Sequence, residues 1–350
     1  MRRHKQARLT IALLTIISIT TLSMSITNAQ SNSNTTPTSA PSKTPTPAPT
    51  RPENETVRQA SNQEIEPLTQ AELSVLTGNI QRPNGLFWFE NKLYTSCTGD
   101  WTVYEIDIAS ASTVQYIFGV RNSHTLYVER DSESNEVNLW IPDFQTNTIA
   151  HINRSGLNVV ASNLNGPWGI TPAGETHFLV TNLLGNNVVK ISRTGEVNEV
   201  LTNLRSPAGI AADQQFIYVA NTGSARRAIE WFSSSEVTDS EEPIDSENSS
   251  AAQTLVTGLQ NTTSIVLASD GYLYFSYALG TRGVVGRVNP EVCRENGGCT
   301  HDQVEIVIYT ELAAPLAGLT ISPNMELFVH SMFSPDIYWV QLNAGGTEGN

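Results

Sequence analysis

The stretch that decides the fold is GPWGITPAGETHFLVTNLLGNNVVKISRTGEVNEVL at residues 166–201, which leads into SPAGIAADQQFIYVANTG at residues 206–223. Both halves begin with a proline, a small residue and a short apolar run, and both continue with a second run that ends in asparagine. Short runs of β-branched and aromatic residues between Gly and Asn turns predict strands. No amphipathic helical pattern separates these runs. The stretch therefore predicts an internal repeat made of β-strands.

The sequence contains six copies of this repeat, with two long insertions between them. Their predicted first strands are residues 83–89, 123–128, 167–172, 207–212, 263–268 and 315–321. Aligned on the residue before each apolar run, the copies follow one another at steps of 40, 44, 40, 55 and 54 residues. A step near 40 residues is the span of one four-stranded β-propeller blade. The two long steps contain an acidic, Ser-rich insertion at residues 233–250 and a loop between two cysteines.

The number of strands predicts how the ring closes. Each of the first five copies has a fourth strand, at residues 113–118, 157–161, 196–201, 253–257 and 303–309. The sixth copy ends near Leu342 after three strands, whereas a matching strand, ELSVLTG at residues 72–78, precedes the first copy. Pairing that strand with the last blade removes the exposed sheet edges of a linear array. We predict an all-β, six-bladed β-propeller over residues 67–343 with one-plus-three closure.

The N-terminal segment predicts export. Four basic residues precede an apolar stretch and the small-residue sequence TNAQ at residues 27–30, which is typical of a secretory signal peptide over residues 1–29. A retained membrane anchor is the alternative, because the apolar stretch is just long enough to span a bilayer. Residues 30–66 are a Ser/Thr/Pro-rich linker, and residues 344–350 are a short tail, both expected to be disordered. We therefore expect a secreted, extracellular or cell-surface protein without a membrane-spanning segment in its mature chain.

Charge and cysteine content bear on the possible binding partners and on the disulfide bonds of this chain. The formal net charge of −14 argues against binding nucleic acid, because the phosphate backbone would be repelled. Cys293 and Cys299 bracket the short loop RENGG, and an oxidising compartment allows them to form a local disulfide. A metal site with His301 is the alternative for this pair. Cys97 is expected to be a buried small apolar residue. We expect a monomer.

The repeat as a whole resembles a known superfamily. The pattern Pro-x-Gly-Ile/Leu, then a strand ending Val-Ala/Thr-Asn, then Val-x-Lys/Arg-Ile/Val is similar to that of NHL-type propellers. It also resembles the wider group of gluconolactonases, paraoxonases, strictosidine-synthase-like proteins and streptogramin lyases. The resemblance covers all six copies, roughly residues 70–342, and implies the architecture more strongly than an activity, because one scaffold hosts many functions.

A propeller of this kind predicts where a ligand binds. The openings of the first strands and the ends of the second strands meet on one face, which we call the mouth. The openings contribute residues such as Asn84, His124 and Trp168, and the second strands and their loops contribute residues such as Asp143 and Asn182. The residues expected to contact a ligand there are Asn84, Trp101, Trp168 and Tyr277.

Two kinds of chemistry are conceivable at the mouth. The resemblance to lactonases implies a divalent cation such as Ca²⁺, with oxygen ligands from Asn84, Asp143, Asn182 and Asn221. No Glu stands at the opening of any blade, which departs from the lactonase pattern. Alternatively, Asp143 orients His124 as a general base, with His330 joining from blade 6. This second arrangement is similar in kind to the histidine-based mouth of streptogramin lyases.

The sequence therefore leaves two main function hypotheses, beside a third in which the acidic insertion at residues 233–250 is itself the partner-binding element. The first is a non-catalytic extracellular binding or scaffold module that uses the mouth to hold a small molecule, a protein or a glycan. This hypothesis follows from the linker, from the ordinary blade repeats and from the absence of Glu at the blade openings. The second is a secreted hydrolase of the lactonase type, or a lyase, with or without Ca²⁺. A turn-capping role is an alternative for Asn182 and Asn221, because Asn at a strand end often bonds its own backbone.

Overall fold

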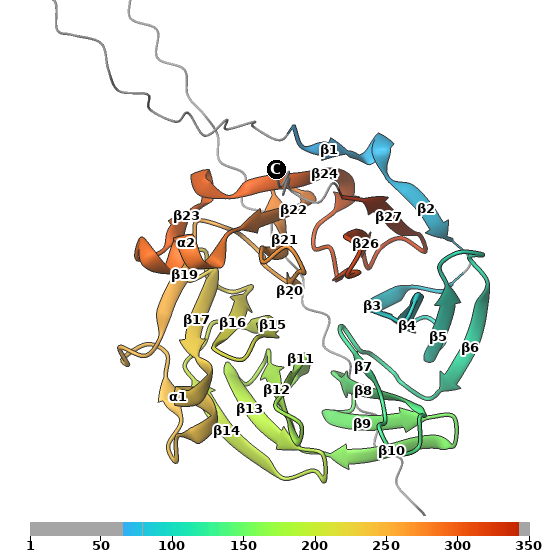
Figure 1. Cartoon of the computed structure of the whole chain (residues 1–350), viewed down its shortest axis with the longest axis horizontal. Coiled ribbons are helices and arrows are strands. Elements are labelled where there is room, and N and C mark those ends of the chain that lie inside the picture. The colour runs from blue at the N-terminus through green and yellow to red at the C-terminus, as the bar shows by residue number, and fades with distance from the viewer. Residues whose placement is uncertain (1–65, 79, 343–350) are drawn as a thin grey trace, which may run out of the picture. The chain divides into compact units, whose positions relative to one another are not determined.

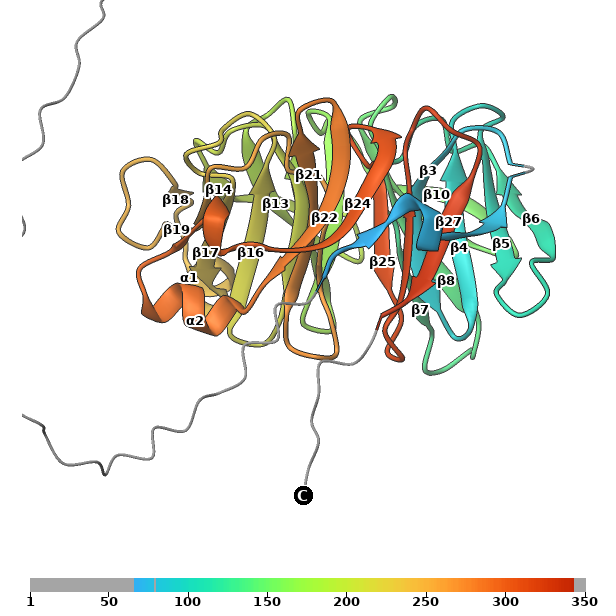
Figure 2. The same cartoon turned by 90° about the horizontal axis from the view of Figure 1, so that it is seen from above.

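The computed structural model describes residues 66–78 and 80–342. The predicted signal peptide, nearly all of the predicted linker and the predicted tail lie outside these residues. Six separate sheets, each built on four antiparallel strands, are arranged in a ring, as Figure 1 shows from one face and Figure 2 from the side. The prediction of an all-β, six-bladed propeller is confirmed.

Each blade is named by its place in the ring, and its strands are given from the innermost to the outermost. Blade 1 consists of β3 (Pro83–Phe89), β4 (Lys92–Cys97), β5 (Thr102–Asp107) and β6 (Thr113–Phe118). Blade 2 consists of β7 (Tyr127–Arg130), β8 (Val137–Asp143), β9 (Thr148–Asn153) and β10 (Gly156–Ala161). Blade 3 consists of β11 (Pro167–Ala173), β12 (His177–Asn182), β13 (Asn187–Ser192) and β14 (Val197–Thr202).

The remaining blades follow the same order. Blade 4 consists of β15 (Pro207–Ala212), β16 (Phe216–Asn221), β17 (Ile229–Ser233) and β19 (Gln253–Thr257). Blade 5 consists of β20 (Ile265–Leu267), β21 (Leu273–Leu279), β22 (Arg282–Val288) and β24 (Glu305–Ala313). Blade 6 consists of β25 (Gly318–Ile321), β26 (Glu326–His330), β27 (Ile337–Gln341) and β2 (Ser74–Thr77).

The ring is closed by its first and last segments. β2 pairs antiparallel with β27, so that Ser74 lies opposite Trp339 and Thr77 opposite Ile337. In Figure 1 the blue β2 lies beside the dark red β27. Leu76 on β2 is buried, and so is Leu73, which directly precedes β2. The strand predicted at residues 72–78 therefore supplies the outer edge of blade 6.

The core lies between the blades. Six hydrophobic clusters are found, and each combines side chains from two neighbouring blades. Phe328 of blade 6, for example, shares a cluster with Leu93 and Ile106 of blade 1. Because both faces of each sheet are covered, the middle strands read as nearly continuous apolar runs in the sequence. This packing explains why no helix is needed to cover the sheets.

The glycines at the blade openings are required by close approach of the next blade. A Cβ atom on Gly209 would lie 2.6 Å from the carbonyl oxygen of Thr263, and one on Gly318 would lie 2.6 Å from that of Asn84. Both distances are far inside van der Waals contact. The small residue used to align the six copies thus marks the place where neighbouring blades meet at the axis.

Two openings of diverged sequence form short inner strands. Residues 123–128 and 263–268 were predicted as strands, whereas β7 begins at Tyr127 and β20 at Ile265. The residues before β7 bond to other groups instead, since Ser96 Oγ donates to the carbonyl of Ser123. The sequence pattern therefore placed both inner strands but not their starts.

The two long insertions hold short elements on the outer side of blades 3 to 5. The acidic insertion contains helix α1 (Ser234–Asp239) and strand β18 (Ile244–Asp245), which pairs parallel with β14. The second contains helix α2 (Pro290–Glu295) and strand β23 (Cys299–Thr300), which pairs parallel with β19. Neither the helices nor these added strands were predicted. No helix in the described part of the chain is both long enough and apolar enough to cross a membrane.

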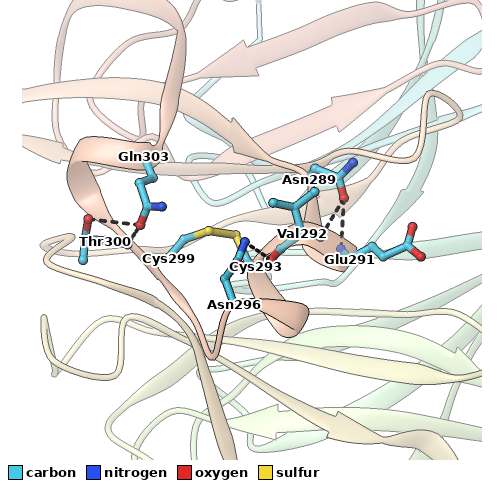
Figure 3. The surroundings of a disulfide bond; sticks show 8 residues. All are labelled: Asn289, Glu291, Val292, Cys293, Asn296, Cys299, Thr300 and Gln303. Atoms are coloured by element: carbon cyan, nitrogen blue, oxygen red, sulfur yellow. Dashed lines mark hydrogen bonds between the residues drawn. A yellow bond between two sulfur atoms is a disulfide. The ribbon is translucent and has the colours of Figure 1, made fainter. Parts of the chain in front are cut away.

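The predicted disulfide is present. Figure 3 shows Cys293 in α2 joined to Cys299 at the start of β23. The N-terminus of α2 is capped by Asn289, whose Oδ1 accepts from the backbone N–H groups of Glu291 and Val292. Cys97 is buried, as expected, and burial raises the pKa of its thiol.

Candidate functional site

The centre of the mouth is a cluster of polar and aromatic side chains from blades 1, 2 and 3. The rings of His124 and Trp168 stack in parallel, with 3.4 Å between their centroids. Phe144 meets both rings edge-on, at 5.6 Å from His124 and 5.8 Å from Trp168. His124 and Asn84 are buried, whereas Trp168 is half-buried. The structure thus brings three of the predicted mouth residues into direct contact.

Asn84 determines which nitrogen of His124 carries the proton. The Asn84 Nδ2 amide donates to Asn122 Oδ1 at 3.1 Å, so that Asn84 Oδ1 faces His124 Nδ1 at 3.2 Å. An amide oxygen can only accept, so Nδ1 donates and Nε2 keeps the lone pair. Burial, with a smaller contribution from nearby His330, lowers the pKa of His124 to about 3. At neutral pH the mouth centre therefore presents an uncharged imidazole.

Asp143 does not contact this imidazole through a hydrogen bond within the described residues. Its carboxylate accepts four backbone N–H bonds, at 2.7–3.3 Å. The donors belong to Arg121, Asn122, Gln145 and Thr146. These four N–H donors occupy the four lone-pair sites of the two carboxylate oxygens. The side chain thus fixes the loop that carries His124, and the orienting partner predicted for the imidazole is replaced by Asn84.

His330 belongs to a belt of hydrogen bonds between the blades. It donates from Nε2 to the carbonyl of Asn84 and is fully buried. At the equivalent strand position, hydroxyl groups donate to the opening of the next blade: Ser96 to Ser123, Thr181 to Ala208 and Ser276 to Leu316. Burial lowers the pKa of His330, which keeps it neutral. The contact that the structure gives His330 is therefore one that links blade 6 to blade 1.

The four residues predicted to hold a cation offer few free oxygens. The oxygens of Asp143 and Asn84 are engaged as described. Asn221 Oδ1 accepts from the Arg205 backbone at 3.1 Å, which joins it to the loop before blade 4. Asn182 Oδ1 is buried and has no partner among the described residues. Across residues 66–78 and 80–342, no group of three or more His, Cys, Asp or Glu side chains is placed to hold a metal ion. A cation held by all four residues would replace hydrogen bonds that Asn84, Asp143 and Asn221 make in this structure.

The two remaining mouth residues differ in exposure. Tyr277 is buried in the core between blades 4 and 5, where burial raises its pKa to about 12. Trp101 lies at the surface, with the Arg121 guanidinium 5.1 Å from its ring centroid and Phe118 at 6.3 Å. Sequence reasoning missed Arg121, Asn122 and Phe144. Their positions in the sequence could have identified them, because all three stand in loops that lead into or out of the mouth.

A channel continues along the axis beneath the His124 cluster. It has a volume of about 280 Å³ and is lined by the inner strands of all six blades. Its lining reaches up to His124 and includes aliphatic side chains such as Leu86, Ile170 and Leu319. The mouth centre thus lies at one end of this channel.

Solved structures with the same fold include enzymes of two kinds. A gluconolactonase from Xanthomonas campestris is 15% identical and superposes with a TM-score of 0.57, covering 77% of this chain and 89% of its own. A streptogramin B lyase is 15% identical with a TM-score of 0.53, covering 77% and 97%. A catalytically inactive histidine-to-alanine variant of virginiamycin B lyase from Staphylococcus aureus, with quinupristin, is 16% identical with a TM-score of 0.51, covering 78% and 99%.

These similarities confirm the fold and the predicted resemblance to the gluconolactonase and streptogramin-lyase propellers as an architecture. Identities of 15–16% carry no activity with them. No protein-family model matches the sequence, and no curated protein matches it either.

Proposed function

We propose that this protein is an exported binding module that holds its ligand on the mouth face of the propeller. The observation that carries the proposal is a set of large apolar side chains, 41–68% exposed, on the loops and strand ends of that face in blades 1, 3, 5 and 6: Trp101, Phe118, Leu184, Leu279 and Phe333. We call these five residues the apolar rim. Large exposed apolar patches on soluble proteins commonly mark binding sites.

The distribution of exposed apolar residues supports this choice of face. The other large apolar side chains that are exposed in the described residues lie on the outermost strands, except Val292 in α2. None lies in the turns of the opposite face that join first to second strands. The rim surrounds a buried polar centre, which is the usual combination of apolar contact area and a few orienting groups. Export is part of the proposal and is supported by the disulfide, which an oxidising compartment maintains.

The test is binding to glycan and peptide arrays by the wild type and two double variants. Leu184→Ser with Leu279→Ser removes two rim residues, while Val114→Ser with Val159→Ser removes two exposed apolar residues from outer strands β6 and β10. We expect ligands of the wild type to lose at least tenfold in affinity only with the rim variant. Equal effects of both variants, or no ligand for the wild type, would refute the proposal.

A lyase or hydrolase is the second candidate, and one observation favours it. The Nε2 lone pair of His124 is held in a fixed tautomer at the mouth centre by Asn84. A neutral imidazole with a free lone pair can accept a proton from a substrate, although a pKa of about 3 makes it a weak base. Turnover of gluconolactone or quinupristin that is lost in His124→Ala and lowered in Asn84→Ala would support this function. Absence of turnover on both substrates would exclude these two activities.

Calcium dependence is tested separately by thermal melting in Ca²⁺ and in chelator. Asn182 Oδ1 is the one oxygen of the predicted ligand set that is buried without a partner in the described residues. A rise in Tm with Ca²⁺ that Asn182→Ala abolishes would support a cation at the mouth. Equal melting curves in both conditions would show that Ca²⁺ does not stabilise the folded protein.

A further inference from the structure

The sector of the mouth at blade 1 carries an arginine where the repeat favours a small residue. Arg82 precedes the opening proline of blade 1 and has φ 56°, in the left-handed region. Its carbonyl accepts from Thr98 N, and the same bond is made in blades 3 and 4. There the equivalent residues are Gly166 and Ser206, also at positive φ.

A tryptophan occupies a second position of this kind. Trp101 precedes the third strand of blade 1 at φ 59°, and its carbonyl accepts from Gly119 N. In blades 2 and 3 the same bond is made by Asn147 and Asn186, at φ 59° and 55°. Asn tolerates the left-handed region, whereas a bulky side chain there costs about 1 kcal/mol. Arg82 and Trp101 are thus larger than the Gly, Ser and Asn residues at the same positions of the sibling blades, which favours a role for the two side chains beyond the turn itself.

Arg82 and Trp101 belong to the same surface. The backbones of their loops are joined, because Gly99 N donates to Gln81 O at 3.1 Å. Arg121 lies over the Trp101 ring, and Phe118 lies beside that ring. We call Arg82, Trp101, Phe118 and Arg121 the blade 1 patch. The acidic residue of this loop, Asp100, is engaged by the Tyr104 hydroxyl at 2.6 Å and the Thr102 amide at 3.2 Å.

A groove adjoins the patch on the side of blade 6. It has a volume of about 600 Å³, and Arg82 forms part of its wall. The rest of its lining is mainly apolar and includes Ile80, Met332, Phe333 and Pro335. Such a groove can take one large apolar side chain, and methionine adapts its shape to different occupants.

The charges of the patch define its partner. Arg82 and Arg121 are exposed, and within the described residues neither forms an ion pair, in a chain whose formal net charge is −14. The Arg121 guanidinium lies over the Trp101 ring, and two guanidinium groups without ion-pair partners attract carboxylates.

We propose that the blade 1 patch and its groove bind an extended acidic peptide segment of another protein, with one large apolar residue of that segment in the groove. Carboxylates of the segment pair with Arg82 and Arg121, and its backbone crosses the loop that carries Trp101. This inference rests on the proposed binding function and names the partner class for one sector of the mouth.

The experiment measures binding of a fluorescein-labelled peptide in which Glu and Asp flank a single central Trp. A peptide with Lys and Arg in place of the acids is the control ligand. The test variant is Arg82→Gly with Trp101→Asn, which restores the residues found in sibling blades and should keep the fold intact. The control variant is Arg154→Gly with Leu157→Asn, which removes one exposed arginine and one exposed leucine from β10 and the turn before it, away from the mouth.

We expect the wild type and the control variant to bind the acidic peptide, with affinity that falls as salt is raised. The test variant should lose at least tenfold in affinity at unchanged or higher Tm, and the basic peptide should not bind. Undiminished binding by the test variant, or equal binding of both peptides, would overturn the inference. If the acidic peptide does not bind but an array ligand still depends on Leu184 and Leu279, this inference is wrong and the binding function stands. Binding of neither refutes both.

Discussion

At the scale of single residues, the mouth depends on partners that lie on different blades. His124 on blade 2 stacks on Trp168 of blade 3 and bonds to Asn84 of blade 1. The expected partner, Asp143, lies on the same blade but is occupied by backbone amides. His124 is therefore buried beside neutral side chains, and this burial accounts for most of the lowering of its pKa.

The lowered pKa predicts how stability depends on pH. In the unfolded chain His124 has a pKa near 6.5, so between about pH 6.5 and 3 the unfolded state binds a proton that the folded state does not. The contribution of His124 to stability is therefore fully present above about pH 6.5 and is lost as pH falls, by at most about 1.4 kcal/mol per pH unit. Denaturant titrations at several pH values should show a shallower decline for His124→Gln. Identical slopes for variant and wild type would contradict the assignment.

His330 should matter for stability before it matters for function. His330→Ala leaves a cavity at a fully buried site and removes the donor to the Asn84 carbonyl. We expect the free energy of unfolding to fall by about 3 kcal/mol, from the cavity and the unpaired carbonyl together. Chemical denaturation measures this, with the less buried His177→Ala as control. A loss below about 1 kcal/mol would show that the bond between blades 6 and 1 is dispensable.

At the scale of elements, three short strands extend blades 3, 4 and 5 on their outer edges. β18 pairs with β14, β23 with β19, and β1 (Leu68–Thr69) with β24, all in parallel. In each case the chain then continues into the outermost strand of the following blade. The segment thus covers an open strand edge and ties two blades together. This arrangement explains why both insertions stand between a third and a fourth strand.

The disulfide holds one of these segments in place. Cys293 and Cys299 are six residues apart, and their bond joins α2 to the start of β23. Closing so short a loop restricts the unfolded chain by about 2 kcal/mol in the chain-entropy model. We expect Cys293→Ser with Cys299→Ser to lower the free energy of unfolding by about that amount. Cys97→Ser is the control for loss of a thiol. Because Cys97 is buried, this variant also loses stability, so the comparison is made by hydrogen exchange near β23. We expect exchange there to rise in the double variant and to rise less in Cys97→Ser.

At the scale of the whole ring, stability depends on a strand from the start of the described chain. β2 supplies the outer strand of blade 6, and without it β27 becomes an open edge. The pairing joins residues far apart in sequence, as when Ser74 lies opposite Trp339. Propeller closure is therefore a long-range contact that the local repeat does not provide.

Truncation tests the closure directly. A chain that begins at Asn79 lacks β2, whereas one that begins at Glu72 keeps β2 but lacks β1. We expect the shorter chain to lose several °C more in Tm and to aggregate, because it exposes β27 and loses the burial of Leu73 and Leu76. Melting and size-exclusion chromatography measure both effects. Equal Tm for the two truncated chains would show that closure by β2 contributes nothing.

Much of the fold was predictable because the pattern of each strand is local. The inner strand of blade 4 was predicted at residues 207–212 and is observed as Pro207–Ala212, and its outermost strand was predicted at residues 253–257 and is observed as Gln253–Thr257. The closing strand followed from counting strands, and the disulfide from the spacing of its two cysteines. The helices in the insertions were not predicted, because they are only six residues long and carry weak periodicity.

The sequence by itself determined the number of blades and the order of the strands, because hydrophobic period and turn residues act over a few neighbours. The closure was predicted by counting those strands, although the contact itself joins the two ends of the described chain. The tertiary structure alone decided what each mouth residue contacts. His124 and Asn84 are 40 residues apart, and Asp143 is held by the loop that carries Arg121 and Asn122. Hydrogen-bond partners across blades depend on rotamers and distances that no local pattern contains. For this reason the position of the mouth was predicted, whereas the partners of its histidines were not.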